Sequence, residues 1–230
     1  MVFARSQKAR AQGRGARGSL LTEVSKAEKS FKQTPQVLTI TRFRFVRISH
    51  IDLKDQSFRA QIIVELRFKG GANDPKLSAL GEGSEKFPPR VEGQLPRPSA
   101  KWFAGQISIK NFVEEQAPLD DNVHVQGDDV VISRRYQGVF FEVFEMDDFP
   151  FDRQELSIYL AVNCRPAGVT PCLLEVADDA EIDISKSGFR SCTQEYDLDN
   201  RLTSEAIPVA PPDDLYPTVK ICARIYRDPT

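Results

Sequence analysis

The longest regular pattern in the sequence is an alternation of apolar and polar residues between Phe58 and Phe68. Over these eleven residues, every second position is apolar: Phe58, Ala60, Ile62, Val64, Leu66 and Phe68. Four of the five positions between them are charged or carry an amide. Because successive side chains of a strand point to opposite faces of a sheet, this pattern predicts a strand with one buried face.

A second extended segment precedes it, starting at Val37. Phe43 and Phe45 alternate with arginines of the stretch Arg42–Arg47, and the apolar set then changes phase to Val46 and Ile48. A change of phase within a strand is what a β-bulge produces. The arginines fall on one face of this strand, which is more typical of an exposed or inter-subunit surface than of nucleic-acid binding.

Further short strands are expected along the rest of the chain. They lie at Ile107–Ile109, Val123–Val125, Val130–Ile132, Gly138–Phe144, Leu156–Val162, Cys172–Val176 and Val219–Ile225. Gly70-Gly71 and the polar stretch Asp52–Gln56 mark turns, and residues 78 to 101 read as a proline-punctuated loop. Many short strands with turn clusters between them predict an all-β fold, an immunoglobulin-like β-sandwich of about ten strands.

The N-terminal part has a different composition. Residues 1–22 contain five basic and no acidic residues and no apolar core, so they predict a basic, disordered arm. An organelle transit peptide and an incorrect gene start are the alternatives, and no secretory signal is visible. Ser25-Lys26-Ala27-Glu28 has the form of a capping box, so residues 23–36 are assigned to a short helix and linker. The sandwich is assigned to residues 37–230.

Composition argues against several classes of function. The chain of 230 residues has 31 basic and 33 acidic residues, which gives no overall charge for nucleic acid. Its four cysteines form no Cys-x-x-Cys pair and it has only two histidines, so no metal or other cofactor is expected. No phosphate loop or nucleophile elbow is present, so the chain is not expected to be an enzyme. Acidic pairs such as Asp128-Asp129 are interpreted as solvated turns, with calcium binding as the alternative.

The turn between the strands at 138–144 and 156–162 has an unusual order, Phe149-Pro150-Phe151-Asp152-Arg153-Gln154. A hairpin turn folded back onto its own core is one interpretation. Three other motifs accompany it: His50-Ile51-Asp52 through Gln56, Trp102 before the strand at 107–109, and Arg227-Asp228-Pro229 at the end. In this order and spacing, the four resemble the extracellular ligand-binding domain of the pentameric ligand-gated ion channels, or Cys-loop receptors, over residues 37–230.

The resemblance implies a membrane-facing end that couples ligand binding to the pore. Phe149, Pro150 and Phe151 would then pack against the transmembrane part. Asp152 would pair with Arg227 at the same junction, because a carboxylate beside a guanidinium forms charge-assisted hydrogen bonds. Asp52 would belong to the neighbouring turn.

The sequence also departs from the family pattern. Glu142 and Leu156 stand where the family has the two cysteines of its signature disulfide, so that bridge cannot form, as in prokaryotic members. Cys164 and Cys172 are left either as a hairpin disulfide or as buried thiols. Ala104 and Gly105 replace the usual Pro and Asp after Trp102.

The residues that match the family's ligand site are few. They are Phe68, Trp102, Asn163, Tyr196 and Tyr216, and Phe68 is the best surviving member of an aromatic box that would suit a cation. Asn163 stands where the family has a tryptophan. An acetylcholine-like aromatic box is therefore not expected, and Phe68 is also explained as the last inward ring of its strand. The ligand is expected to be an unidentified small molecule.

Two functions follow from the resemblance. In the first, the domain forms a homo- or hetero-pentamer on the extracellular face of a membrane, and a transmembrane domain follows Thr230. In the second, the chain is complete and acts as a soluble, intracellular binding or scaffold module. The membrane-facing motifs favour the first function, while the missing aromatic box and secretory signal favour the second.

Overall fold

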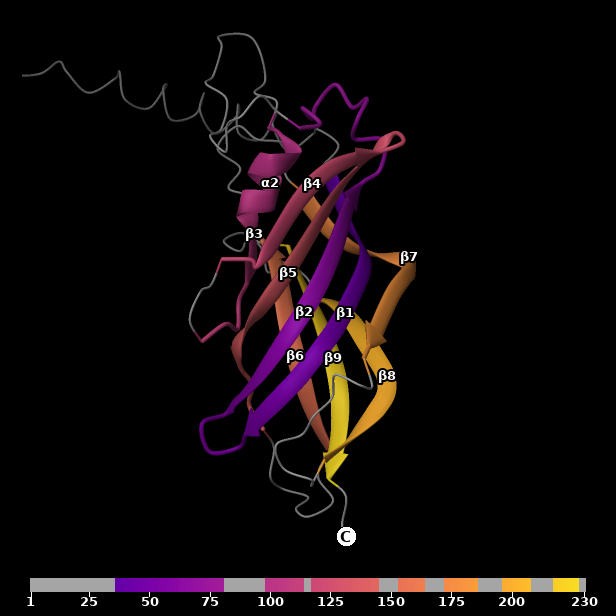
Figure 1. Ribbon diagram of the computed structural model, residues 1–230. Coiled ribbons are helices and arrows are strands. Elements are labelled where there is room, and N and C mark those ends of the chain that lie inside the picture. The colour runs from indigo at the N-terminus through magenta and orange to yellow at the C-terminus, as the bar shows by residue number, and fades with distance from the viewer. Residues whose placement is uncertain are drawn as a thin grey trace, which may run out of the picture. The chain divides into compact units, whose positions relative to one another are not determined.

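Strands make up most of the chain that the structure describes (Figure 1). The computed structural model describes residues 36–80, 98–113, 117–144, 153–163, 172–185, 196–207 and 217–227, with the backbone alone along 196–207 and at 227. All of them belong to the unit Pro35–Thr230. The predicted basic arm, and the predicted helix and linker up to residue 35, lie outside the described residues, and Gln36 already belongs to the first strand.

The first sheet has five strands in the order β4-β5-β2-β1-β7. Their bounds are β1 Gln36–Asp52, β2 Ser57–Phe68, β4 Asp120–Gln126, β5 Asp129–Phe141 and β7 Cys172–Ile184. Neighbouring strands are antiparallel, except that β1 and β7 run parallel. The edge strand β7 is therefore contributed by a segment far along the chain from its neighbour.

The second sheet has four strands in the order β3-β6-β9-β8, all antiparallel. Their bounds are β3 Ile107–Ile109, β6 Arg153–Val162, β8 Tyr196–Ile207 and β9 Thr218–Arg227. The two sheets confirm the predicted all-β sandwich, with nine strands among the described residues.

The two N-terminal strands follow their predicted patterns. The six apolar residues of Phe58–Phe68 are all buried, whereas the positions between them are half-buried or exposed. In β1, the register with β2 shifts between Phe45 and Arg47, which is the predicted bulge. This shift moves the buried positions from Phe43 and Phe45 to Ile48, and a second shift between Ile48 and His50 brings Ile51 inward, while Val46 is only half-buried.

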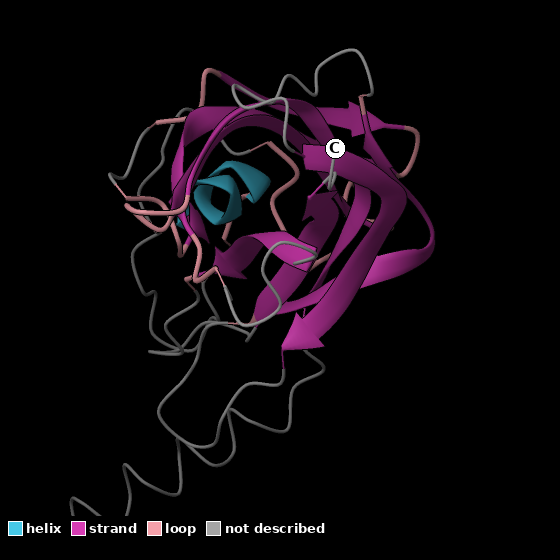
Figure 2. Cartoon of the chain, turned by 90° about the horizontal axis from the view of Figure 1, so that it is seen from below, coloured by secondary structure: helices cyan, strands magenta, loops and turns pink. Residues whose placement is uncertain are grey.

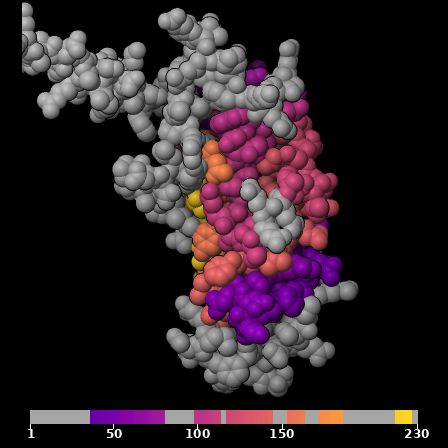
Figure 3. All heavy atoms as spheres, turned by 90° about the vertical axis from the view of Figure 1, so that its left-hand side faces the viewer, coloured from indigo at the N-terminus to yellow at the C-terminus, as the bar shows by residue number. Residues whose placement is uncertain are grey.

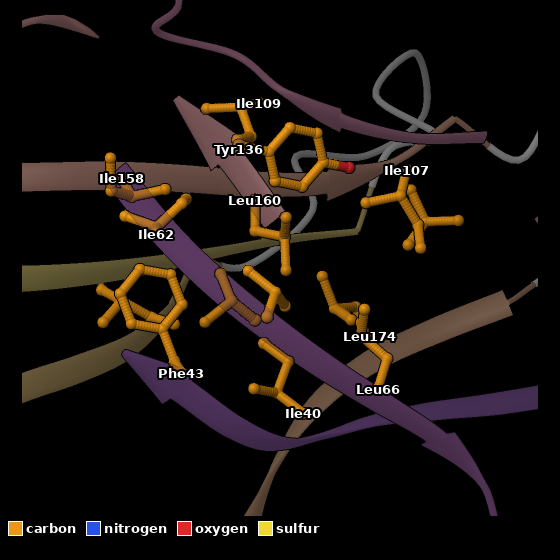
Figure 4. Packing of buried hydrophobic residues seen from close by; sticks show 14 of the residues in the cluster. Ile40, Phe43, Ile62, Leu66, Ile107, Ile109, Tyr136, Ile158, Leu160 and Leu174 are labelled. Atoms are coloured by element: carbon orange, nitrogen blue, oxygen red, sulfur yellow. The ribbon is translucent and has the colours of Figure 1, made fainter. Parts of the chain in front are cut away.

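The core lies between the two sheets and is made of aliphatic and aromatic side chains (Figure 4). Ile40, Phe43 and Ile62 come from the first sheet, and Ile158 and Leu160 face them from the second. The alternating residues predicted for β6 and β9 are fully buried: Leu156, Ile158, Leu160, Val162, Val219, Ile221, Ala223 and Ile225. Burial of this apolar surface is the main force that holds the layers together.

A short helix, α2 (Ala100–Gln106), covers one end of the core. The hydroxyl of Ser99 accepts a hydrogen bond from the Trp102 backbone N–H at 3.1 Å and so caps its first turn. Seen end-on in Figure 2, the helix lies inside the outline of the strands. The sequence patterns predicted a loop up to residue 101, because a seven-residue helix is too short to show a helical period. It is also too short to cross a membrane, and no other described helix does so.

The main differences from the predicted strands concern β5, β7 and β8. The predicted segments at 130–132 and 138–144 belong to the single strand β5, which ends at Phe141. Strand β7 continues to Ile184 past a bulge opposite Thr41 that interrupts its register. Strand β8 was not predicted, because its pairing with β9 shifts between Leu198 and Leu202 and so breaks the alternation.

One side of the sandwich is closed by the segment 107–113, which pairs with both sheets in turn. The Lys110 N–H donates to the Tyr159 carbonyl of β6 at 2.9 Å, and the Val113 N–H donates to the Val139 carbonyl of β5 at 3.0 Å. The ring of Phe112 then lies over Gly138, where an added Cβ would be 2.6 Å from the ring. A glycine at this position lets the segment approach β5 closely.

Candidate functional site

The turn between β1 and β2 contains Asp52, one of the residues expected to couple to a membrane domain. Its Oδ1 accepts hydrogen bonds from the backbone N–H groups of Lys54 and Asp55, each at 3.0 Å. The bond from Asp55 is the largest cause that lowers the pKa of Asp52, and Lys54 and His50 add to it. Gln56 completes the turn with a φ of 51°. The carboxylate of Asp52 therefore shapes its own turn.

The ends of β5 and β6 are fastened to each other by two side chains. Oε2 of Glu142 accepts a hydrogen bond from the Ser157 backbone N–H at 2.6 Å. The side-chain amide of Asn111 donates to the carbonyls of Phe141 at 2.9 Å and Ser157 at 2.7 Å. These bonds hold the chain on both sides of residues 145–152 without a covalent bridge.

The loop between these strand ends contains four of the predicted coupling residues: Phe149, Pro150, Phe151 and Asp152. They lie outside the described residues, and so does the side chain of Arg227. The backbone pairing nevertheless brings their neighbours together, because Arg153, which follows Asp152, pairs with Tyr226, which precedes Arg227.

The segments that carry the coupling motifs gather at one end of the sandwich. Ser57, next to the β1–β2 turn, pairs with Phe141, and the Glu142 N–H donates to the Gln56 carbonyl at 2.9 Å. In Figure 1 this turn, the start of β6 and the end of β9 all lie at the lower end, opposite α2. Figure 3 shows the turn at the same end from the side.

The predicted ligand-binding residues are not gathered in this way. Phe68 is 1% exposed and packs against Phe103, with ring centroids 5.2 Å apart, which is the position of a core side chain. Trp102 lies on α2 and meets the Phe103 ring edge-on, with ring centroids 5.0 Å apart. Asn163 accepts a hydrogen bond from the Lys110 ammonium at 2.9 Å, and its own backbone N–H binds the Gln106 carbonyl at the end of α2.

The two remaining predicted ligand residues are tyrosines. Tyr196 starts β8, where the backbone alone is described, and Tyr216 lies outside the described residues. Phe68, Trp102 and Asn163 are thus linked through α2, while the position of the tyrosine rings relative to them stays a prediction.

The structure contains a polar group between the sheets that the sequence analysis missed. Arg134 points inward from β5 with 7% of its side chain exposed, and its guanidinium forms a two-point ion pair with Asp121 on β4. Its Nη1 also donates to the Tyr136 hydroxyl at 3.3 Å. Burial alone would lower the pKa of Arg134, but the hydrogen bond to Asp121 reverses the effect and raises it. Burial raises the pKa of Tyr136, so its hydroxyl stays protonated at neutral pH.

Arg134 and Tyr136 line a pocket of about 410 Å³ on the side of the sandwich that segment 107–113 closes. Its other walls are mostly apolar and include Ile107, Ile109 and Phe112. Pockets that bind small molecules typically have about this size, with apolar walls and a few convergent polar groups.

The alternation of residues along β5 contains a sequence signal for the inward positions of Arg134 and Tyr136. Val130 and Ile132 are apolar, and Arg134 and Tyr136 occupy the next two positions of the same alternation. An arginine at an inward position needs a buried partner. Asp121 is directly opposite Arg134 in the β4–β5 hairpin, and this register identifies the partner.

The acidic pair Asp128-Asp129 is bound to neighbouring parts of the protein. Asp128 accepts a hydrogen bond from the Asn73 side chain, and Asp129 accepts one from the Gly70 N–H, so both bind a neighbouring turn of the protein. No group of three metal-ligating side chains occurs among the described residues. Cys172 is buried at the start of β7, and Cys164 lies outside the described residues, so their pairing stays open.

Comparisons with known proteins do not assign the chain to a family. No family model matches it, and no curated protein is significantly similar to it.

The Glu142 carboxylate gives a prediction for the pH dependence of stability. Burial raises the pKa of Glu142 above its usual 4.5, although the bond from Ser157 opposes the shift. A carboxyl group with a raised pKa stabilises the fold below its usual pKa and loses this contribution as the pH rises through the raised value. Glu142→Gln keeps an acceptor for Ser157 without ionising, and should raise the melting temperature at neutral pH by about 2 °C. Below the usual pKa of Glu142 the difference should vanish.

Glu155→Gln is the matched control for thermal unfolding measured across this pH range. A hydrogen bond from Lys220, together with Arg224, lowers the pKa of Glu155. The contribution of Glu155 to the stability of the fold is therefore present above its usual pKa and lost as the pH falls. Glu155→Gln should accordingly be less stable than the wild-type chain at neutral pH. A Glu142→Gln variant that is also less stable at neutral pH would contradict the assignment.

Proposed function

We propose that residues 37–230 form the ligand-binding domain of a pentameric ligand-gated ion channel. Five such domains assemble as a ring and bind a small molecule between subunits. The domain transmits the binding signal through the loop Phe149–Phe151 to a transmembrane domain that follows Thr230. Asp152 and Arg227 pair at this junction and keep the loop and the last strand together.

The observation that carries the proposal is the gathering of the coupling motifs at one end of the sandwich. The turn after Asp52, the strand ends on both sides of Phe149–Phe151, and the end of β9 are neighbours through the pairs Ser57–Phe141 and Arg153–Tyr226. These segments are far apart in the sequence, and a shared membrane-facing surface requires them to meet. Their meeting supports the motif-based resemblance with a property that the motifs alone do not contain.

The bonds at the loop base support the same role. A coupling loop must move as a unit with the strands that carry it, which requires firm attachment at its base. Glu142 and Asn111 provide this attachment between the two sheets, with bonds of 2.6 Å to 2.9 Å. They act at the base of the loop that a disulfide closes in the Cys-loop receptors, which the motifs of this chain resemble.

The proposal predicts the assembly of the chain in solution. Light scattering coupled to size-exclusion chromatography, over a wide range of protein concentration, should show a species of five times the 25.9 kDa of one chain. Asp178→Asn removes one charge from an exposed residue in the β7 bulge. The same measurement on this variant tests whether surface charge alone changes the assembly. A chain that stays monomeric at the highest concentration would contradict a self-assembling binding domain and would favour a soluble binding module.

A further inference from the structure

The buried hydroxyl of Tyr136 is a hydrogen-bond donor in need of an acceptor. Its oxygen accepts from Arg134 Nη1, and the described residues offer no acceptor for its own hydrogen. The residue is 3% exposed, so most of its surface is shielded from bulk water. A buried donor without a partner is destabilising, so such a group in a native structure calls for an explanation, and a bound molecule is one.

The surroundings of this donor are apolar and have room for a ring. In Figure 4 the Tyr136 ring lies between Ile109 and Ile107, with its oxygen on the Ile107 side. The Phe112 ring lies 6.2 Å from the Tyr136 ring at an angle of 59°. Together with these side chains, Gly105 lines the pocket of about 410 Å³, and an added Cβ at Gly105 would meet no atom within 4 Å.

The charges of Arg134 and Asp121 disfavour a charged ligand. Arg134 and Asp121 form a closed pair whose net charge is zero, and Asp121 is part of the neighbouring hairpin strand. A carboxylate ligand would be repelled by Asp121 and would compete with it for Arg134, while a cation would be repelled by Arg134 and would compete with it for Asp121. A ligand without net charge avoids both costs, because it leaves the existing pair intact.

We infer that this pocket is a binding site, within a single subunit, for a small uncharged molecule with a planar apolar ring and one hydrogen-bond acceptor. The ligand's ring lies in the pocket against the lining side chains Ile107, Ile109 and Phe112, and its acceptor binds the Tyr136 hydroxyl. The site is formed by one chain and is distinct from a site between subunits. It therefore does not depend on the proposed channel function.

Three probes of similar size test each part of this inference on the 230-residue chain. Acetophenone has the ring and an uncharged acceptor, ethylbenzene has the ring alone, and benzoate has the ring and a negative charge. Titrations followed by chemical-shift changes in nuclear magnetic resonance spectra should give saturable binding of acetophenone. Ethylbenzene should bind about fivefold more weakly, since it lacks one hydrogen bond, and benzoate more weakly still.

Two variants separate this site from other apolar surfaces. Tyr136→Phe keeps the ring and removes the hydroxyl, so it should weaken acetophenone about fivefold and leave ethylbenzene unchanged. Gly105→Leu places a side chain in the open space of the pocket and should abolish binding of both. Tyr159→Phe, on the outer side of β6, is the matched control and should change neither affinity.

The inference fails under any one of three results. Equal affinity of acetophenone for the wild-type chain and for both folded variants would place the binding elsewhere, and the absence of saturable binding of any probe would remove the site. Tighter binding of benzoate than of acetophenone would overturn the assignment to an uncharged ligand. None of these results depends on whether the chain forms a pentamer, so the proposed function is judged separately.

Discussion

Phe140→Ala is expected to lower the free energy of unfolding by about 3–5 kcal/mol, the range for loss of a fully buried phenylalanine. The Phe140 ring is completely buried and stacks between two others, Phe112 at 4.5 Å and Phe58 at 5.3 Å. Removing it leaves a cavity where the segment 107–113 joins the first sheet. Chemical denaturation measured by circular dichroism gives the value directly.

The adjacent residue provides a control with the same substitution. Phe141 is 50% exposed on the opposite face of β5, so Phe141→Ala should change the free energy of unfolding by less than about 1 kcal/mol. The two variants remove the same side chain from neighbouring positions of one strand. Similar losses in both would mean that the inward and outward phases of β5 are wrongly assigned.

Asp121→Ala is expected to have the next largest effect, a loss of about 2–3 kcal/mol in the free energy of unfolding. The substitution leaves the buried guanidinium of Arg134 with the Tyr136 oxygen alone, and an uncompensated buried charge is strongly destabilising. The Asp121 side chain is itself 41% exposed, which is why the value lies below the range for a fully buried pair. Replacing Arg134 as well, with methionine, should recover part of the loss.

The neighbouring pair is a control from the same hairpin. Asp120 faces Arg135 at 3.7 Å, and both side chains are exposed. Asp120→Ala should therefore cost less than about 0.5 kcal/mol. If Asp120→Ala and Asp121→Ala were equally destabilising, burial of Arg134 could not be the cause. The same urea denaturation series measures both.

Much of the sandwich was predictable because the alternation of apolar and polar residues along a strand indicates directly which of its faces is buried. The strand at 58–68 and the strands of Leu156–Val162 and Val219–Ile225 each bury one face of a sheet, and the pattern is visible without any long-range information. The elements that were missed lack such a pattern. Helix α2 is too short, and the irregular pairing of β8 with β9 depends on residues distant in the sequence.

The candidate sites also differ in whether local sequence or long-range strand pairing determines them. The turn at Asp52 follows from local polar residues, and it was predicted. The attachment of Glu142 to Ser157 and the pocket at Arg134 require the positions of two strands relative to each other. A charged residue in an apolar phase, such as Arg134, was the available signal. Its partner became identifiable only through the register of the β4–β5 hairpin.

The parallel pairing of β1 with β7 has a consequence for how the protein is made. Strand β1 emerges from the ribosome before β7, and its partner on the outer side is complete only when Ile184 has been synthesised. At roughly 5–20 residues per second, the interval lasts on the order of ten seconds. During this time the backbone of β1 presents an unpaired edge, which is a template for aggregation. Translation speed and access to chaperones should therefore influence the yield of folded protein more than changes on the outer surface of the second sheet.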